Sequence, residues 1–374
     1  PIYSTVAENI LSGCGVSLSE PSSGECVPHF GGNQGPGYPV FISLSWLVGG
    51  HENIYARLFQ LSFYIIILLY LVRAIKIYTS SPKVALWIGI VLALSPLGIA
   101  WPRYLQTETL ALAGTLWVFS ELLLSLHQSK IRTIPIVVAL VFTTFIRLDA
   151  VLLIAPIVTT LFIIYKPSDF FKKGLLMAMI FSLPWGMWLV RNYAVGMDNI
   201  LPSQMALPQN AKAPDGYLKW CKTWTTLEYQ RPGSQWPITR FVYDNISIDH
   251  GIYATKGEKI KVEKLIKDLK KYTGKPFPKY IDNEFLIIAN DRINNNPIDY
   301  YLIKPVHRMW SLWTNIYGSY GWPTELPGYI PDQERLEISR GDILHKLSFA
   351  LKYPIIASGK IIVNLWKVIL YLLF

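Results

Sequence analysis

The stretch WPRYLQTETLALAGTLWVF, residues 101–119, leads from a charged turn directly into an apolar run. Glu108 stands at the mouth of the run Leu110–Phe119, and a second apolar run, Val84–Trp101, precedes the turn. An ionisable group at the edge of a bilayer is costly to keep, so its default interpretation is a functional site. We therefore predict that two membrane spans meet at Glu108, on one face of the membrane.

The composition of the 374-residue chain indicates a membrane protein. The chain is 51% hydrophobic and 16% charged, whereas about a quarter of a soluble domain is charged. Its 13 Trp and 22 Tyr fit the enrichment of these residues at membrane–water interfaces. Much of the net charge of +10 lies in short loops between apolar runs. We attribute it to the positive-inside bias and expect no nucleic-acid partner.

The apolar runs predict an all-α polytopic membrane protein, because a spanning helix needs about 20 mostly apolar residues. The candidate spans are Ile54–Tyr78, Val84–Trp101, Thr109–Leu126, Ile134–Ile146, Ala150–Tyr165, Gly174–Val190 and Tyr353–Phe374. The segment Gly37–Val48 is too short to cross, and we expect it to lie at the interface or to dip into it.

The charges of the turns orient these spans. Basic residues gather in alternate turns, which we place inside; they are Arg73, Lys76, Lys83, Lys130, Arg132, Lys166, Lys172 and Lys173. The other turns face outside and carry Glu108, Asp149 and Asp198. We expect a first outer loop with interfacial or re-entrant helices (1–53), a six-span bundle (54–191), a soluble, mainly α outer domain (192–350) and a further span (351–374).

The outer domain is expected to contain three helices. Gly257–Lys271 is typical of a basic amphipathic helix, whose sharper interpretation is contact with anionic lipid headgroups. Phe285–Asn294 is predicted to be a helix that ends before Pro297. The third predicted helix is Asp299–Trp313.

The chain lacks the motifs of several soluble enzyme classes. It has no Walker-type phosphate loop, GxGxxG, HExxH or Asp-x-Asp pair, and no CxxC or GxSxG. An enzyme with this sequence is therefore not expected to bind a water-soluble nucleotide sugar in a Rossmann-like fold.

The outer turns bring together residues suited to a lipid-linked phosphosugar. Glu108 is the candidate catalytic residue, because a carboxylate can act as general base or bind a divalent metal such as Mg²⁺ or Mn²⁺. Arginine suits a phosphate because its donors form a fork. The candidate substrate-binding residues are Arg103, Tyr104, Arg147, Arg191, Asn192, Tyr38 and His29.

Short motifs follow one another along most of the chain: Tyr3–Gly13, Gly35–Pro39, Arg57-Leu58, Thr107–Leu110, Pro184-Trp185, Arg191–Tyr193, Asn296-Pro297, Tyr300-Tyr301 and Arg308. Their order resembles the GT-C class of polytopic glycosyltransferases, in the branch of the protein O-mannosyltransferases and lipid A aminoarabinose transferases. Tyr3–Gly13 resembles the first outer loop of that branch, and Thr107–Leu110 resembles its second acidic motif.

This resemblance implies transfer of a hexosyl or pentosyl group from a polyprenyl-phosphate donor to a hydroxyl of a lipid, glycan or protein acceptor. It implies a multi-pass protein of the bacterial inner or plasma membrane, or of the endoplasmic reticulum in a eukaryote, in contact with membrane lipids. The family's key first-loop acid lies just before the segment that Tyr3 matches. We expect the chain to be a fragment that lacks this residue.

Other interpretations stand beside these. Glu108 can be a helix N-terminal acid with Thr107 as its cap. Arg103, Arg147 and Arg191 can be interfacial anchors, with Asp149 paired to Arg147. The whole chain can be a transporter or flippase of lipid-linked sugars, or an inactive GT-C scaffold.

Two smaller features concern polar residues and cysteines. Glu121 lies near the inner end of its span, and we expect it to make a structural polar contact. Cys14 and Cys26 both fall on the outer loop and can form a disulfide in an oxidising compartment, which leaves Cys221 free.

Overall fold

The computed structural model describes residues 2–18, 26–28, 35–95, 98, 101–196, 211–226, 233–248, 250–314 and 343–373. Within these ranges all regular structure is helical, apart from one isolated β-bridge between Ser17 and Pro28. This confirms the all-α expectation. The chain divides into two compact units, unit 1 (Pro1–Pro202 with Ser319–Phe374) and unit 2 (Ser203–Gly318). The predicted outer domain, 192–350, contains unit 2 and extends beyond it at both ends.

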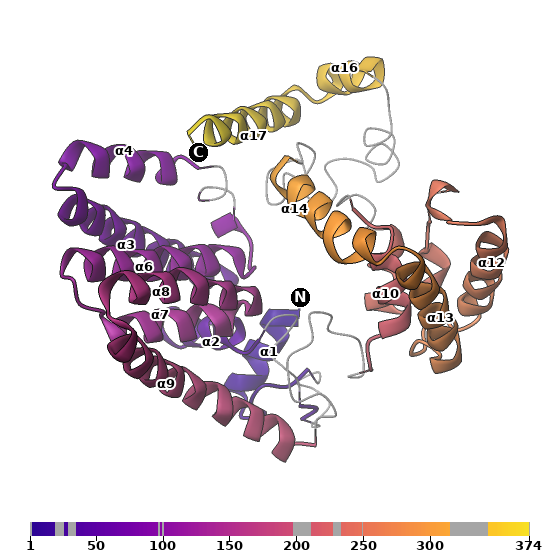
Figure 1. The fold of residues 1–374 in the computed structure, drawn as a ribbon, viewed down its shortest axis with the longest axis horizontal. Coiled ribbons are helices and arrows are strands. Elements are labelled where there is room, and N and C mark those ends of the chain that lie inside the picture. The colour runs from indigo at the N-terminus through magenta and orange to yellow at the C-terminus, as the bar shows by residue number, and fades with distance from the viewer. Residues whose placement is uncertain are drawn as a thin grey trace. The chain divides into compact units, whose positions relative to one another are not determined.

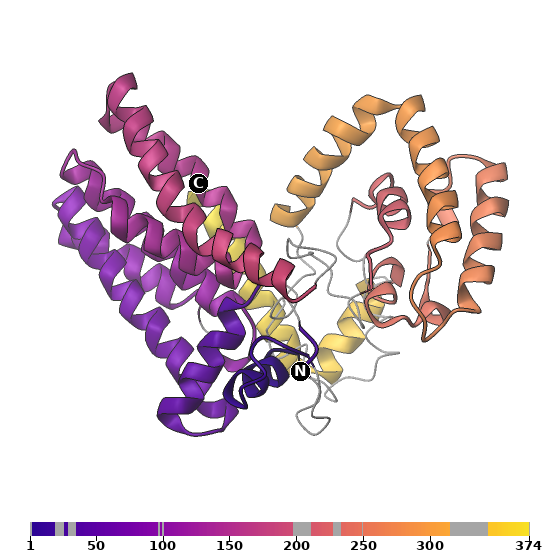
Figure 2. The same cartoon turned by 90° about the horizontal axis from the view of Figure 1, so that it is seen from below.

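Unit 1 contains a bundle formed by α1 to α9, whereas α16 and α17 pack on each other (Figures 1 and 2). Its helices are α1 (Ile2–Leu11), α2 (Gly37–Gly49), α3 (Asn53–Thr79), α4 (Pro82–Ala93), η2 (Trp101–Arg103), α6 (Glu108–His127), α7 (Thr133–Ile146), η3 (Leu148–Leu153), α8 (Ile154–Ile164), α9 (Pro167–Ala194), α16 (Ile343–Lys352) and α17 (Pro354–Leu373).

Three helices of unit 1, α3, α6 and α9, are long and apolar enough to cross a membrane. They differ in how much of their surface the protein covers. In the most apolar window of α6, 61% of residues are buried, against 6% in α9. Large apolar side chains of α9 are instead exposed, including Leu183 at 66% and Met187 at 75%. Such a surface is typical of a helix that faces lipid, and the total number of membrane crossings stays a prediction.

The predicted span Val84–Trp101 is not one continuous helix. Helix α4 ends at Ala93 after 12 residues, a length of about 18 Å against the roughly 30 Å of a bilayer core. The prediction was wrong because Ser95 precedes Pro96, and proline disfavours the helical conformation of the residue before it. A prediction based on hydrophobicity alone does not take this backbone restriction into account.

The predicted span Ala150–Tyr165 is also divided. Its first part is a 3₁₀ helix, η3, and α8 begins only at Ile154. Pro156 explains the restart, because proline lacks an N–H and is tolerated in the first turn of a new α-helix. By contrast, α3, α6 and α7 begin and end within one or two residues of the predicted spans.

Close helix packing in unit 1 depends on glycine. A Cβ atom on Gly37 would lie 2.8 Å from the carbonyl oxygen of Phe145, so the start of α2 approaches the end of α7 only because Gly37 has no side chain. Gly114 of α6 likewise faces the side chain of Thr143 on α7, where a Cβ atom has no room. Small residues allow this close approach between helices in membranes.

Unit 2 consists of shorter helices around an aromatic core. They are α10 (Asp215–Lys222), η5 (Ile238–Arg240), η6 (Tyr243–Asn245), η7 (His250–Ile252), α12 (Lys256–Lys270), α13 (Lys279–Asn295), η8 (Asp299–Ile303) and α14 (Lys304–Thr314). The fully buried side chains of this core include Tyr217, Trp220, Tyr243 and Phe285.

Two of the predicted helices in unit 2 need correction, whereas α12 matches its prediction. Helix α13 begins at Lys279, six residues before the predicted start at Phe285, directly after Pro278. The predicted helix Asp299–Trp313 opens with a π-helical turn, η8, before α14. Pro305 gives a physical reason, because its ring would clash with the carbonyl four residues earlier in an α-helix, and the wider turn relieves that clash.

Candidate functional site

Glu108 is the first residue of α6, and an arginine from another helix binds its carboxylate. Oε1 accepts a hydrogen bond from Nη1 of Arg147 at 3.1 Å. Thr107 donates its hydroxyl to Oε2 at 3.4 Å and makes no capping bond to the backbone of α6. Thr107 thus occupies the N-cap position, as expected, but its side chain does not cap the helix. The N-terminal position still suits Glu108, because a helix N-terminus favours negative charge.

Arg147 joins the two carboxylates of the outer turns. It follows α7 directly, and its Nε and Nη2 donate to the two oxygens of Asp149 at 3.0 and 2.9 Å. The expected pairing of Arg147 with Asp149 is confirmed. The contact of Arg147 with Glu108 also shows that the start of α6 lies beside the end of α7. We call Glu108, Arg147 and Asp149 the outer network; it combines one cation with two carboxylates.

The outer network is open to solvent. The side chains of Glu108 and Asp149 are 30% and 53% exposed, and that of Arg147 is 26% exposed. Both carboxylates therefore keep oxygen lone pairs that a ligand can reach, because an ionised carboxylate accepts up to about four hydrogen bonds. The structure thus places the Glu108 carboxylate and the Arg147 guanidinium side by side at a partly exposed position.

Two tyrosines lie beside the outer network, Tyr3 half-buried and Tyr38 fully buried. The rings of Tyr3 on α1 and Tyr38 on α2 meet edge to face at 5.0 Å. Burial, with a further contribution from the Glu108 carboxylate, raises the pKa of the Tyr3 phenol to about 12. Burial also raises the pKa of Tyr38 well above its usual value, again with contributions from Tyr3 and Glu108. Both phenols therefore keep their proton at physiological pH.

Gln60 connects Tyr38 to the turn before Glu108. The Tyr38 hydroxyl donates to Oε1 of Gln60 at 3.0 Å, and Nε2 of Gln60 donates to the carbonyls of Pro102 and Tyr104, both at 2.8 Å. The sequence analysis missed both Gln60 and Tyr3 as parts of the site. A signal for Gln60 exists, because it is a polar residue inside the apolar run Ile54–Tyr78, where polar groups are expensive.

Arg103 and Tyr104 occupy the turn that Gln60 holds. Arg103 ends η2, is exposed, and forms no ion pair within the described part of the chain. Tyr104 contributes its backbone carbonyl to Gln60, and its own buried hydroxyl has no hydrogen-bond partner among the described residues. Arg103 is thus a cation open to a ligand at this turn, whereas Tyr104 holds the turn in place.

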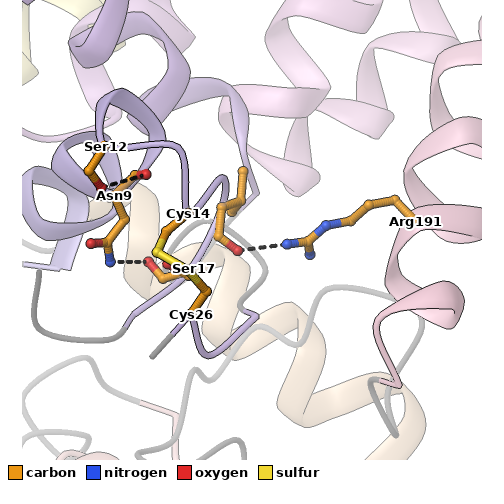
Figure 3. Close-up of a disulfide and its surroundings, with 7 residues drawn as sticks. Asn9, Ser12, Cys14, Ser17, Cys26 and Arg191 are labelled. Atoms are coloured by element: carbon orange, nitrogen blue, oxygen red, sulfur yellow. Dashed lines mark hydrogen bonds between the residues drawn. A yellow bond between two sulfur atoms is a disulfide. The ribbon is translucent and has the colours of Figure 1, made fainter. Parts of the chain in front are cut away.

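Arg191 and Asn192 lie near the end of α9, and Arg191 contacts the disulfide loop (Figure 3). Arg191 donates from Nη2 to the carbonyl of Val16 at 2.7 Å and from Nη1 to Oδ1 of Asn192 at 3.0 Å. The Cys14–Cys26 disulfide closes this loop. Cys221 is free and buried, as expected.

The remaining predicted residues separate into two groups. His29 and Asp198 lie outside the described residues. Glu121 makes the expected structural contact, because its buried carboxylate pairs with Arg132 at 2.8 Å and accepts from the hydroxyl of Tyr70 at 2.8 Å. This pair joins α6, α7 and α3 and is separate from the outer network.

The described residues do not by themselves form a resident metal site. Nowhere in the described ranges do three His, Cys, Asp or Glu side chains gather closely enough to hold an ion. Both carboxylates of the outer network, moreover, already accept hydrogen bonds from Arg147. The expected divalent metal stays a prediction.

Comparisons of this chain with protein-family models, with curated proteins and with solved structures give no match. The resemblance to GT-C enzymes therefore rests on the motifs of the sequence alone.

Proposed function

We propose that this chain is a membrane glycosyltransferase of GT-C type that moves a sugar from a polyprenyl-phosphate donor to an acceptor hydroxyl on the outer face. The observation that carries the proposal is the outer network, in which Arg147 joins Glu108 and Asp149 at the ends of α6 and α7. A solvent-accessible acid–base cluster at the end of a helix apolar enough to span a membrane is the arrangement that a lipid-linked substrate requires.

In this proposal Glu108 is the general base. Among the described residues, Oε2 contacts only the Thr107 hydroxyl, at 3.4 Å, so it keeps accepting capacity for the acceptor hydroxyl. The hydroxyl proton passes to Glu108 while the hydroxyl oxygen bonds to C1 of the sugar. The bond between C1 and the phosphate oxygen breaks, and the polyprenyl phosphate leaves with the electron pair. Proton transfer to a positioned side chain is worth roughly 10²–10⁴ in rate.

Arg147 and Arg103 are the proposed phosphate ligands. The donor phosphate competes with Asp149 for Arg147, which is feasible because the Asp149 side chain is 53% exposed. Arg103 adds a second cation. It forms no ion pair with the described residues, so none has to break when it binds the phosphate. Stabilisation of the negative charge that develops on the leaving phosphate lowers the barrier. Arg191 would have to leave Val16 to take part, so we assign it first to holding the disulfide loop.

A transfer assay tests the proposal. The protein in lipid is offered a panel of polyprenyl-phosphate sugars beside nucleotide sugars, and the products are read by mass spectrometry. We expect one lipid-linked donor to be consumed, and Glu108→Gln to lower the rate by about 10²–10⁴. Glu52→Gln, an exposed carboxylate just before α3, is the matched control and keeps the wild-type rate.

A second variant separates catalysis from binding. Arg147→Lys keeps the charge but loses the fork, so we expect a higher KM for the donor with a smaller change in kcat. A wild-type rate in Glu108→Gln would remove the role of Glu108. Failure of folded protein to consume any donor would favour a scaffold whose outer network only holds α6 to α7, or a transporter of lipid-linked sugars.

A further inference from the structure

Unit 2 contains a pocket of about 450 Å³. It lies between the end of α13, the turn η8, the residues that follow α10 and the segment around η7. Its walls include Trp224, Arg292, Asn295, Asn296, Asp299 and Tyr300. The volume lies in the range of roughly 300–1,000 Å³ that is typical of small-molecule sites. The proposed transfer reaction uses none of these residues.

The charged groups of the pocket are already paired. Arg292 donates to the carboxylate of Glu258 at 2.6 and 3.0 Å, to the hydroxyl of Thr223 at 3.1 Å and to the carbonyl of Ile252 at 2.7 Å. Because every nitrogen of this guanidinium is occupied, it offers no free fork to a phosphate. Lys304 lies 3.6 Å from the carboxylate of Asp299. The pocket is therefore better matched to a neutral ligand than to an anion.

Several polar groups nevertheless stay available. Among the lining residues, Trp224 is only 7% exposed, and its indole N–H is fully buried, out of reach of a ligand. Asn296 uses its side-chain oxygen to accept from the backbone N–H of Asp299 at 3.2 Å, which leaves its amide N–H groups free to donate. Asn295 is exposed at the rim and offers both a donor and an acceptor.

The π-helical turn η8 supplies one wall of the pocket. Asp299 and Tyr300 are consecutive residues of this turn, and both line the pocket. Tyr300 contributes an aromatic surface, and the carboxylate of Asp299 contributes hydrogen-bond acceptors. A ligand that suits this wall has C–H groups to pack on an aromatic ring and hydroxyls to bind at its edge.

From these features we infer that the unit 2 pocket binds a neutral saccharide. The hydroxyls of a saccharide both donate and accept, so they match the amides of Asn295 and Asn296 and the carboxylate of Asp299. The inference does not depend on the proposed transfer reaction, because it concerns binding to unit 2 alone.

Saturation-transfer NMR on the full chain in lipid nanodiscs tests the inference. The neutral probes are methyl mannoside, maltose, lactose and chitobiose, and the anionic probes are glucose 6-phosphate and sialyllactose. We expect saturation transfer to at least one neutral probe, and this binding persists in Glu108→Gln. A failure of the saccharide site is thereby distinguished from a failure of the transferase proposal.

Paired variants place the binding in the pocket. Tyr300→Ala removes an aromatic contact and is expected to raise the dissociation constant about tenfold. Asn295→Ala removes one or two hydrogen bonds and is expected to raise it about two- to tenfold. Asn294→Ala is the matched control, because Asn294 is exposed beside Asn295 but does not line the pocket. Circular dichroism melting confirms that each variant is folded.

Three outcomes would overturn the inference. They are folded wild-type protein that binds no neutral probe, binding unchanged in both Tyr300→Ala and Asn295→Ala, and binding of the anionic probes in preference to the neutral ones.

Discussion

Helix α9 of unit 1 and helix α12 of unit 2 both lie at the surface of their unit, yet they expose opposite chemistry. On α9, Leu183 and Met187 are 66% and 75% exposed. On α12, Val262 and Leu269 are fully buried, whereas the side chains of Lys259 and Lys261 are 45% and 44% exposed. Helix α9 is suited to a lipid solvent and α12 to water, because apolar surface costs free energy only where water meets it.

The two units also differ in the side chains that hold their interiors together. Unit 1 buries polar groups between helices, such as the Glu121–Arg132 pair and Gln60. Unit 2 is built mainly around aromatic rings, with Trp220 packed against Phe285 at 5.1 Å, and it also buries the Arg292–Glu258 ion pair. In lipid, helices associate through close packing and polar contacts rather than through the hydrophobic effect. Substitutions should therefore affect the two units differently.

The largest expected effect is in the aromatic core of unit 2. Trp220→Ala removes a fully buried ring and should cost about 3–5 kcal/mol of stability. Hydrogen exchange, read separately for peptides of each unit, should show faster exchange in unit 2 alone. Met187→Ala on the exposed face of α9 is the control and should leave both units unchanged. Equal loss of protection in the two units would contradict their independence.

The second effect tests which solvent each surface helix meets. Leu183→Lys on α9 should oppose membrane insertion by about 3 kcal/mol, since a cation near the centre of a span is expensive. Ile260→Lys on α12 is the matched change, because Ile260 is 69% exposed, and it should have little effect. Membrane integration is measured by protease protection. A Leu183→Lys protein that inserts normally would show that α9 does not face lipid at this position.

The third effect concerns close helix packing. Gly114→Ala should destabilise unit 1 by about 1–3 kcal/mol, because the new methyl group meets Thr143. Gly186→Ala on α9 meets nothing within 4 Å and should stabilise the helix by up to about 1 kcal/mol. Thermal unfolding of both variants in lipid gives the comparison, and shifts of the same sign would argue against the α6–α7 contact.

The smallest effect is a pH dependence in unit 2. Burial raises the pKa of the Asp282 carboxyl, although it accepts a hydrogen bond from the backbone N–H of Tyr217. Its contribution to stability is therefore complete below the unfolded pKa of about 4 and is lost as the pH rises through the folded pKa. Asp282→Asn should stabilise unit 2 at neutral pH, with the advantage vanishing near pH 3. Denaturant unfolding across this range measures it, and an unchanged pH profile would exclude Asp282 as the cause.

The sequence predicted α3 and α6 well because their signal is local, whereas α9 begins seven residues before and ends four residues after the predicted span Gly174–Val190. Ile54–Tyr78 and Thr109–Leu126 differ from α3 and α6 by one residue at each end. A long apolar run determines where a spanning helix begins and ends, whatever its neighbours are. The prediction failed for Val84–Trp101, where proline breaks a run that hydrophobicity treats as continuous.

The candidate site was predictable only in part. The charges at Glu108, Arg147 and Asp149 drew attention because each stands at the end of an apolar run. Tyr3 was missed, since its burial beside Tyr38 arises from the packing of α1 on α2. Arg191 was selected for its fork of donors, but the structure directs that fork to the carbonyl of Val16, 175 residues away.

The sequence by itself determined that this chain is helical, which of its runs are apolar enough to cross a membrane, and where its charges stand along the chain. The tertiary structure alone decided which charges far apart in the chain meet. Glu108 and Arg147 are 39 residues apart, and they pair because the start of α6 lies beside the end of α7. Hydrophobic length acts locally along the chain, whereas a side-chain partner depends on how helices pack in three dimensions.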